Sequence, residues 1–186
     1  EFDAFGISLD ERAGRLNEGI RAIRALWTED VTNFEGKYFN YDNVTQRPLP
    51  LQKPHPPIWL ASKAEGAVRQ AARNSDAWFA DPITPFSVLK LRLAAYKETL
   101  AELGKPTSGF DFPIFREAYV ADTDEQAWEE AKEGVLFIYK EYLEWGHLLD
   151  EDGRPVKPDT IAKSLAIGNP AAGPFALETL AATGGT

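Results

Sequence analysis

The sequence contains no cysteine and only two histidines among its 186 residues. The absence of cysteine excludes disulfide bonds, thiolate metal sites and cysteine nucleophiles. Two histidines also argue against a histidine-based metal centre, because such sites usually combine several imidazole or carboxylate ligands. We therefore expect that the chain binds no metal ion.

Long hydrophobic segments and secretion signals are missing as well. No apolar run approaches the roughly 20 residues that a membrane-spanning helix needs, and the first ten residues, EFDAFGISLD, do not form a signal peptide. We therefore expect no membrane association and a cytoplasmic location. Methionine is absent from the whole chain, including position 1, so we also expect the chain to be a fragment of a longer protein.

Positive charge is in the minority, with 20 basic against 29 acidic residues and a net charge of −9. No stripe of Lys and Arg is present, which argues against a nucleic-acid partner. Hydrophobic residues make up 44% and aromatic residues 12% of the chain, which is enough to bury a core. The composition therefore predicts a folded, acidic protein of about one domain.

The central stretch, residues 54–82, contains two short apolar runs, IWLA at 58–61 and AWFA at 77–80. A short amphipathic segment separates them. Two apolar runs joined by a helix are typical of a βαβ unit with parallel strands. Ligands of such units bind at the carboxyl ends of the strands, which places Ser62 and Asp81 at the expected ligand edge.

The remaining segments also alternate between helix and strand, which predicts an α/β fold with a parallel sheet and helical cover. We expect helices at 13–30, 86–103, 124–145 and 175–182, a third strand at 112–120, a proline-rich insert at 31–57 with a hairpin or turn at 34–39, and a polar excursion at 147–167.

Four helix starts carry capping signals. Ser8 and Ser62 each begin an S-x-x-E pattern, the sequence of a capping box. Thr84 precedes a proline and Thr123 precedes Asp-Glu-Gln, so we expect both threonines to be N-cap residues. Of the two histidines, His55 between prolines is interpreted as a loop residue rather than a ligand, and His147 as part of a helix cap.

Several motifs together resemble the bacterial luciferase-like monooxygenases, a family of flavin-dependent oxidoreductases built on the (β/α)₈ TIM barrel. The resemblance extends from residue 1 to about residue 168. The motifs that carry it are EFDAFG at 1–6, ERAGRLNEGI at 11–20, FEGKYF at 34–39, RPLPLQKPHPPIWLAS at 47–62, AARNSDAWF at 71–79 and REAYVADTDEQAW at 116–128.

The resemblance implies that residues 1–186 form a single partial barrel domain, with about strands five to seven and their helices. The cofactor would be reduced FMN, used with O₂ for monooxygenation, or the deazaflavin F420, used for hydride transfer on a small organic substrate. A reductase could supply the reduced flavin. We expect the fragment alone to be inactive and the protein to be a homo-oligomer. The alternative is a non-catalytic half-barrel for flavin binding or assembly.

In the family, the turn after the fifth strand helps to hold the flavin phosphate, and the matching residues are Ala61, Ser62, Lys63, Ala64 and Glu65. The physics agrees, because a helix N-terminus offers unpaired N–H groups and a positive dipole end. Alternatively, Ser62 is an N-cap paired with Glu65. The two interpretations compete for the same N–H groups, and the negative charge of Glu65 counts against a phosphate there.

The resemblance also implies that Trp78 and Asp81 line the flavin pocket. The alternative is that the aromatic residues at 78–79 belong to the core and that Asp81 is a turn residue. We favour a core position for Phe79.

Arg116 and Glu117 are the candidate catalytic residues. They are adjacent in the third predicted strand, so they point to opposite faces and one of them faces the barrel lumen. A relative that acts on alkanesulfonates has an active-site His at the position of Glu117, where a carboxylate could orient substrate or move a proton. The alternative is a buried ion pair.

Overall fold

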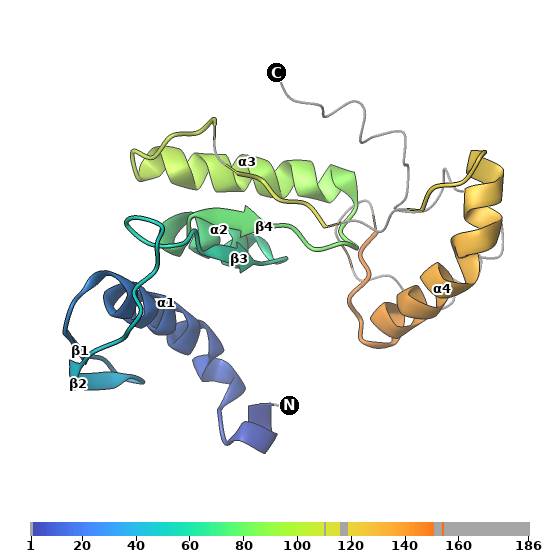
Figure 1. The fold of residues 1–186 in the computed structure, drawn as a ribbon. Coiled ribbons are helices and arrows are strands. Elements are labelled where there is room, and N and C mark those ends of the chain that lie inside the picture. Colours follow the sequence, from blue (N-terminus) through green and yellow to red (C-terminus); the bar gives the residue numbers. More distant parts are fainter. Residues whose placement is uncertain (1, 110, 116–118, 151–153, 155–186) are drawn as a thin grey trace.

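The computed structural model describes residues 2–109, 111–115, 119–150 and 154, and its elements mix helices and strands as predicted (Figure 1). Two short 3₁₀ helices precede the first α-helix. The elements are the 3₁₀ helices Phe2–Phe5 and Leu9–Glu11, α1 (Arg12–Thr28), β1 (Thr32–Glu35), β2 (Asn40–Val44), β3 (Trp59–Ala61), α2 (Glu65–Asn74), β4 (Ala77–Phe79), α3 (Phe86–Glu102) and α4 (Asp124–Glu144).

The predicted βαβ unit is confirmed. Strands β3 and β4 are parallel, and Ala61 at the end of β3 pairs with Phe79 at the end of β4. Beyond β4, Ala80 forms an isolated parallel bridge with Ile114. Of the third strand predicted at 112–120, the described residues show only this bridge, and residues 116–118 lie outside the described part of the chain. The predicted helix at 175–182 and most of the excursion also lie outside it.

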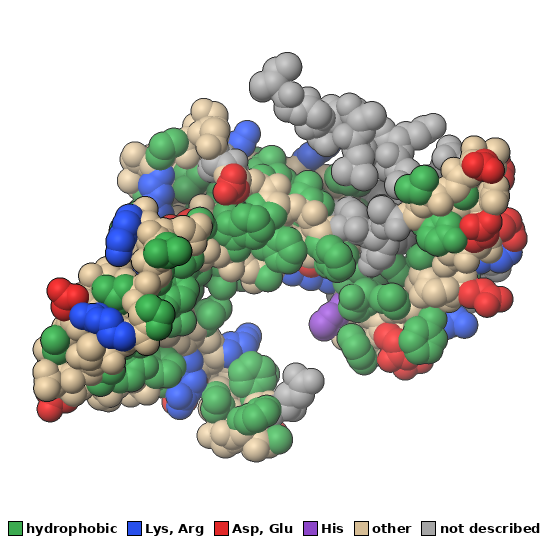
Figure 2. Space-filling model, in the orientation of Figure 1, with side chains coloured by type: hydrophobic (Ala, Val, Ile, Leu, Met, Phe, Trp, Pro, Cys, Tyr) green, Lys and Arg blue, Asp and Glu red, His purple; other side chains and the backbone are tan. Residues whose placement is uncertain are grey.

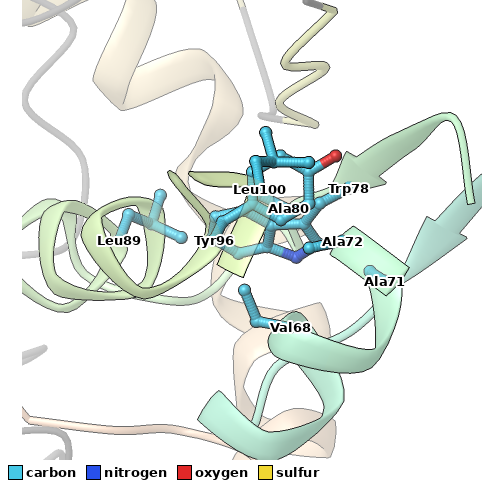
Figure 3. Close-up of a cluster of buried hydrophobic side chains, with 8 residues drawn as sticks. All are labelled: Val68, Ala71, Ala72, Trp78, Ala80, Leu89, Tyr96 and Leu100. Carbon is cyan, nitrogen blue, oxygen red and sulfur yellow. The ribbon is translucent and has the colours of Figure 1, made fainter. Parts of the chain in front are cut away.

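One hydrophobic core lies between this sheet and helices α2 and α3 (Figure 3). Trp78 is its largest fully buried side chain, and its ring centroid lies 5.9 Å from that of Tyr96 and 5.0 Å from that of Phe112. Ala71 and Ala72 of α2 are completely buried. Their small side chains let α2 approach the sheet closely. The small residues on one face of this helix predict such close packing.

The surface is not uniformly polar. Hydrophobic side chains remain exposed over the central part of the molecule, and acidic side chains gather over α4 (Figure 2). Trp59 and Phe115, for example, are each 50% exposed. No helix in the described ranges is both long enough and apolar enough to cross a membrane.

The insert at 31–57 contains the predicted hairpin, formed by the antiparallel strands β1 and β2. Its turn is attached to α1 by one buried carboxylate. Glu18 accepts hydrogen bonds from the backbone N–H groups of Lys37 (3.1 Å), Tyr38 (2.6 Å) and Phe39 (2.8 Å). A Cβ at Gly36 would lie 2.2 Å from Glu18 Oε1, so only glycine fits beside this carboxylate.

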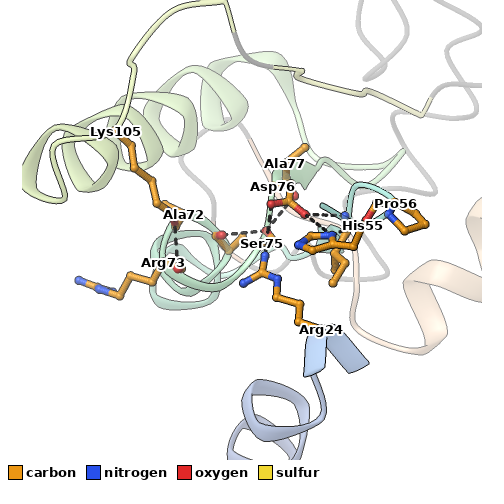
Figure 4. A network of polar contacts seen from close by, with 11 residues as sticks. Arg24, His55, Pro56, Ala72, Arg73, Ser75, Asp76, Ala77 and Lys105 are labelled. Atoms are coloured by element: carbon orange, nitrogen blue, oxygen red, sulfur yellow. Dashed lines mark hydrogen bonds and ion pairs between the residues drawn. The ribbon is translucent and has the colours of Figure 1, made fainter. Parts of the chain in front are cut away.

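The start of β4 is fixed by another carboxylate (Figure 4). Asp76 accepts a hydrogen bond from the Ile58 N–H at 2.8 Å and forms an ion pair with Arg24 of α1 at 3.2 Å. His55 lies beside this pair in the loop, as predicted, with its Nδ1 donating to the Pro56 carbonyl at 2.8 Å. The network joins α1, the proline-rich loop and both parallel strands.

Two of the four predicted N-caps are wrong, and Ser8 occupies an N-cap position without the predicted side-chain bond. Ser8 precedes a 3₁₀ turn and its side chain caps nothing; Pro85 rather than Thr84 is the N-cap of α3; and Ser62 lies two residues before the N-cap of α2, which is Ala64. The prediction for α4 is confirmed, because Thr123 accepts the Gln126 N–H at 3.1 Å. The motifs locate helix starts to within a few residues but do not determine which side chain reaches the free N–H groups.

We predict that Glu18→Gln loosens the hairpin and lowers the melting temperature most at neutral pH. Burial raises the pKa of Glu18. The three backbone donors and the charge of Arg21 together lower it by more, so the pKa of Glu18 lies below the ordinary 4.5. A lowered folded-state pKa stabilises the protein above about pH 4.5, and this contribution disappears as the pH falls through the folded value.

Thermal melts of both proteins between about pH 3 and pH 7 test this, because the difference should shrink as Glu18 becomes protonated. Glu35→Gln is the matched control, since Glu35 is exposed in the same hairpin. A difference in melting temperature that does not depend on pH would contradict the assignment.

Candidate functional site

The structure brings the two predicted ligand-edge segments together. Ser62 follows β3 directly, and its backbone N–H reaches the carbonyl of Phe79 at the end of β4 over 3.4 Å. Asp81 lies two residues after Phe79 in the chain. The turn between β3 and α2 and the turn after β4 therefore share one edge of the sheet.

The capping box predicted for Ser62 and Glu65 does not form. Ala64, with extended backbone, occupies the N-cap position of α2, and no side chain caps the helix there. Ser62 Oγ is buried and has no hydrogen-bond partner in the described part of the chain. The physical reason is spacing: a serine two residues before the N-cap lies outside the position from which a side chain caps the first-turn N–H groups.

Glu65 makes ion pairs instead. Its carboxylate contacts Arg69 of the same helix at 3.2 Å and Arg92 of α3 at 3.0 Å. Arg69 also pairs with Glu98 at 2.7 Å, so two guanidinium groups and two carboxylates form one network. The negative charge that argues against a phosphate at this turn is therefore offset by its own partners.

Lys63 is the cationic side chain of the turn. Burial lowers the pKa of its ammonium, and the charge of Asp81 partly opposes that shift. The ammonium donates a hydrogen bond to the main-chain carbonyl of His147, which lies just beyond α4. Lys63 therefore lies where the sheet edge meets the C-terminal end of α4.

Asp81 has the geometry of a turn residue. Its Oδ1 accepts the N–H groups of Ile83 (3.0 Å) and Thr84 (2.9 Å), and its Oδ2 accepts the Thr84 hydroxyl at 2.6 Å. These contacts shape the segment that leads from β4 into α3. This is the alternative that the sequence left open for Asp81.

Trp78 occupies the core position that the sequence left open as an alternative, whereas Phe79, for which a core position was favoured, is only partly buried. Trp78 is 1% exposed and packs in the core against α2 and α3, so it does not line a pocket on the other face of the sheet. Phe79 points to that other face, because side chains alternate along a strand, and its ring stacks on Trp59 with 6.3 Å between centroids. The motif around residues 77–80 is apolar on both faces, so sequence alone did not separate them.

Trp78 still acts on the site, through its indole N–H. This group donates a hydrogen bond to the carbonyl of Ser62 at 2.8 Å. A core side chain thereby holds the turn that carries Ser62 and Lys63. Sequence reasoning missed this contact because it joins a residue of β4 to the turn after β3, 16 positions away in the chain.

The two remaining sets of predicted residues have different outcomes. Arg116 and Glu117 lie outside the described residues. His147 caps α4 as predicted, but through its backbone: its N–H bonds to the Tyr142 carbonyl at 2.8 Å, and Gly146 has a φ of +68°. Gly146 and His147 form the Schellman arrangement that commonly ends helices.

Sequence reasoning also missed Arg69 and Arg92 as partners of Glu65. The i, i+4 spacing of Glu65 and Arg69 is a signal that could have found the first pair. Arg92 comes from the next helix, and no local pattern reveals it.

A family model described as luciferase-like monooxygenase matches residues 1–185. The chain belongs to the luciferase-like monooxygenase family. This confirms the resemblance seen in the sequence motifs.

Curated relatives of this luciferase-like chain use two kinds of flavin cofactor. The chain is 39% identical over 82 residues to the FMNH₂-dependent dimethylsulfone monooxygenase of Pseudomonas putida, a match that covers 42% of this chain and 23% of the relative. It is 37% identical over 68 residues to the F420-dependent glucose-6-phosphate dehydrogenase of Kineococcus radiotolerans, covering 37% of this chain and 20% of the relative. The chain thus matches well under two thirds of each relative's length.

The fold is shared with solved structures. The monooxygenase RslO1 of Streptomyces bottropensis superposes with a TM-score of 0.63 at 23% identity, over 93% of this chain and 55% of that one. At this identity the likeness concerns the fold alone.

We predict that Trp78→Phe destabilises the protein by about 1 kcal/mol or more, because the Ser62 carbonyl loses its donor while an aromatic ring remains in the core. Urea denaturation followed by circular dichroism measures the change. Trp145→Phe is the control, since Trp145 is 61% exposed. Equal losses in the two variants would show that the indole N–H contributes nothing.

Proposed function

We propose that this luciferase-like chain forms part of a (β/α)₈ barrel, about strands five to seven, in a flavin-dependent oxidoreductase. The whole of residues 1–186 would be one partial barrel domain. The parallel order of β3, β4 and the segment at Ile114 supports this placement, as does a fold match that covers 93% of this chain and 55% of RslO1. The enzyme would act on a small organic substrate with reduced FMN and O₂, or with F420.

The observation that carries the cofactor site is the hydroxyl of Ser62, which has no hydrogen-bond partner among the described residues. It is buried beside a helix N-terminus that no side chain caps. First-turn N–H groups need acceptors, and phosphate groups commonly supply them. There is also room at the first turn of α2, because a Cβ built at Gly66 would meet no atom of the described residues within 4 Å.

Each residue of the turn then has a proposed role. Ser62 donates its hydroxyl to the cofactor phosphate, and Lys63 supplies positive charge. The first-turn N–H groups of α2, from Glu65 onward, supply further donors, because the N-cap residue Ala64 has no side chain that competes for them. The flavin itself, when bound, supplies the redox chemistry.

Other residues of the proposed pocket belong to the face of the sheet opposite the core. Phe79 and Trp59 stack there and offer an aromatic surface, whereas Trp78 positions the turn from behind. Asp81 shapes the segment that enters α3. We propose Glu117 and Arg116 as the residues that orient substrate or move a proton.

The cofactor spectrum of the full-length protein that contains this chain decides between the two cofactors. Flavins and the deazaflavin F420 have different absorbance and fluorescence. We expect one of them to copurify with the protein or to bind on titration. A full-length protein that binds neither would overturn the proposal and favour the non-catalytic alternative.

We predict that Ser62→Ala weakens FMN binding by roughly three- to tenfold, the usual worth of one hydrogen bond. Binding of riboflavin, which lacks the phosphate, should not change. Ser62→Asp should weaken FMN binding further, because two negative charges repel.

Titration followed by flavin fluorescence measures both affinities, and F420 replaces FMN if the spectra identify it. Ser8→Ala is the matched control, since the Ser8 side chain makes no capping bond at a distant helix start. If Ser62→Ala binds FMN and riboflavin as the wild type does, Ser62 is not a phosphate ligand.

Partners of the protein follow from the cofactor. An enzyme that uses FMNH₂ needs a source of reduced flavin, so we propose that a separate reductase supplies it. The homo-oligomer stays a prediction, which light scattering on the purified protein tests.

A further inference from the structure

Lys63 joins two parts of the chain that are 84 residues apart in sequence. Its ammonium donates to the main-chain carbonyl of His147. That carbonyl belongs to a well-defined turn, because the N–H groups of Gly146 and His147 bond back to Leu143 (2.9 Å) and Tyr142 (2.8 Å). The carbonyl that accepts from Lys63 is therefore part of the backbone turn that caps α4, and its position is fixed by the hydrogen bonds of that turn.

Apolar packing holds the same end of α4 against the sheet edge. Ile83, Tyr139 and Leu148 form a cluster whose members are 4%, 3% and 6% exposed. Ile83 lies in the turn after β4, and its N–H bonds to Asp81 at 3.0 Å. The end of α4 and the two turns at the carboxyl edge of the strands are thus in direct contact.

The ammonium of Lys63 can do more than hold this contact. A lysine ammonium carries three N–H donors, of which the His147 carbonyl uses one. Its charge is half-buried, and Asp81 offsets only part of the lost hydration. An anionic group at the neighbouring Ser62 turn would restore the missing electrostatic stabilisation without displacing the carbonyl.

We infer that the C-terminal turn of α4 is a positioning element of the phosphate site, which fixes Lys63 through the His147 carbonyl. Phosphate binding and the docking of α4 on the sheet edge then favour each other. The His147 carbonyl holds the Lys63 ammonium in place for the phosphate, and the phosphate stabilises the charge of that ammonium beside α4. By linkage, each process must favour the other to the same extent. This inference rests on the proposed function, since it requires the cofactor phosphate at Ser62 and Lys63.

The test compares FMN with riboflavin in the full-length protein, because the two ligands differ only in the phosphate. Leu148→Ala disrupts the apolar cluster and leaves the Ser62 turn unchanged. We expect it to weaken FMN binding about fivefold or more, the lower end of typical coupling between sites, and to leave riboflavin binding unchanged. Phe137→Ala is the matched control on the same helix, since Phe137 is 67% exposed. It should affect neither ligand.

Hydrogen exchange gives a second readout that does not depend on activity. FMN should slow exchange of the Gly146 and His147 amides, and riboflavin should not. Lys63→Gln should abolish this protection, whereas Lys63→Arg, which keeps the charge, should retain part of it. If F420 is the cofactor, F420 and its phosphate-free core replace FMN and riboflavin.

The outcomes separate the inference from the proposed function. A folded Leu148→Ala protein with wild-type FMN affinity, or an absence of FMN-dependent protection at residues 146–147, overturns the role of α4 and leaves the phosphate site standing. Wild-type protein that binds FMN no more tightly than riboflavin removes the phosphate site itself. If Leu148→Ala fails to fold, the exchange measurement on the wild type and Lys63→Gln decides.

Discussion

The indole of Trp78 connects the hydrophobic core to the carboxyl edge of the parallel strands. Its ring fills the space between the sheet and helices α2 and α3, and its N–H bonds to the carbonyl of Ser62. The turn that carries Ser62 and Lys63 is thereby fixed by the same side chain that stabilises the fold. A ligand site attached to the core in this way is as rigid as the core. A site made of backbone N–H groups requires such rigidity, because its donors must stay in position.

Three carboxylates of this acidic chain organise the backbone. Glu18 receives three N–H groups of the hairpin turn, and Asp81 receives two at the entrance to α3. Asp76 joins the start of β4 to the residue before β3. Each carboxylate satisfies donors that would otherwise be unpaired, and such charge-assisted bonds are stronger than neutral ones. The net charge of −9 therefore reflects structural roles as well as surface charge.

Membership of the luciferase-like family suggests how these local arrangements are related to one another. Relatives of the chain use FMNH₂ or F420, and such cofactors bring their own redox chemistry. Under the proposed function, the protein would have to hold a phosphate, offer a flat surface and exclude water. The described residues provide an uncapped helix start, a stacked aromatic pair and a lysine shared with α4. The chain spans only part of its relatives' length, so a complete pocket is a property of the proposed whole barrel.

The sequence by itself determined the elements with strong periodicity or clear punctuation. The parallel pair β3–β4, the hairpin and the glycine-ended helices α3 and α4 follow from short-range patterns, because alternation, helical spacing and turn residues act within a few positions. The βαβ pattern likewise predicted that Ser62 lies at the carboxyl edge of the strands, where the structure places it.

Tertiary structure decided which side chain does what at that edge. Trp78 lies in the core and Phe79 on the opposite face, although both are aromatic neighbours in one apolar run. Ser62 lies outside the capping position, and Glu65 turns to Arg92 of another helix. These outcomes depend on contacts between residues far apart in the chain, and a local pattern contains no information about which distant partner will be closest.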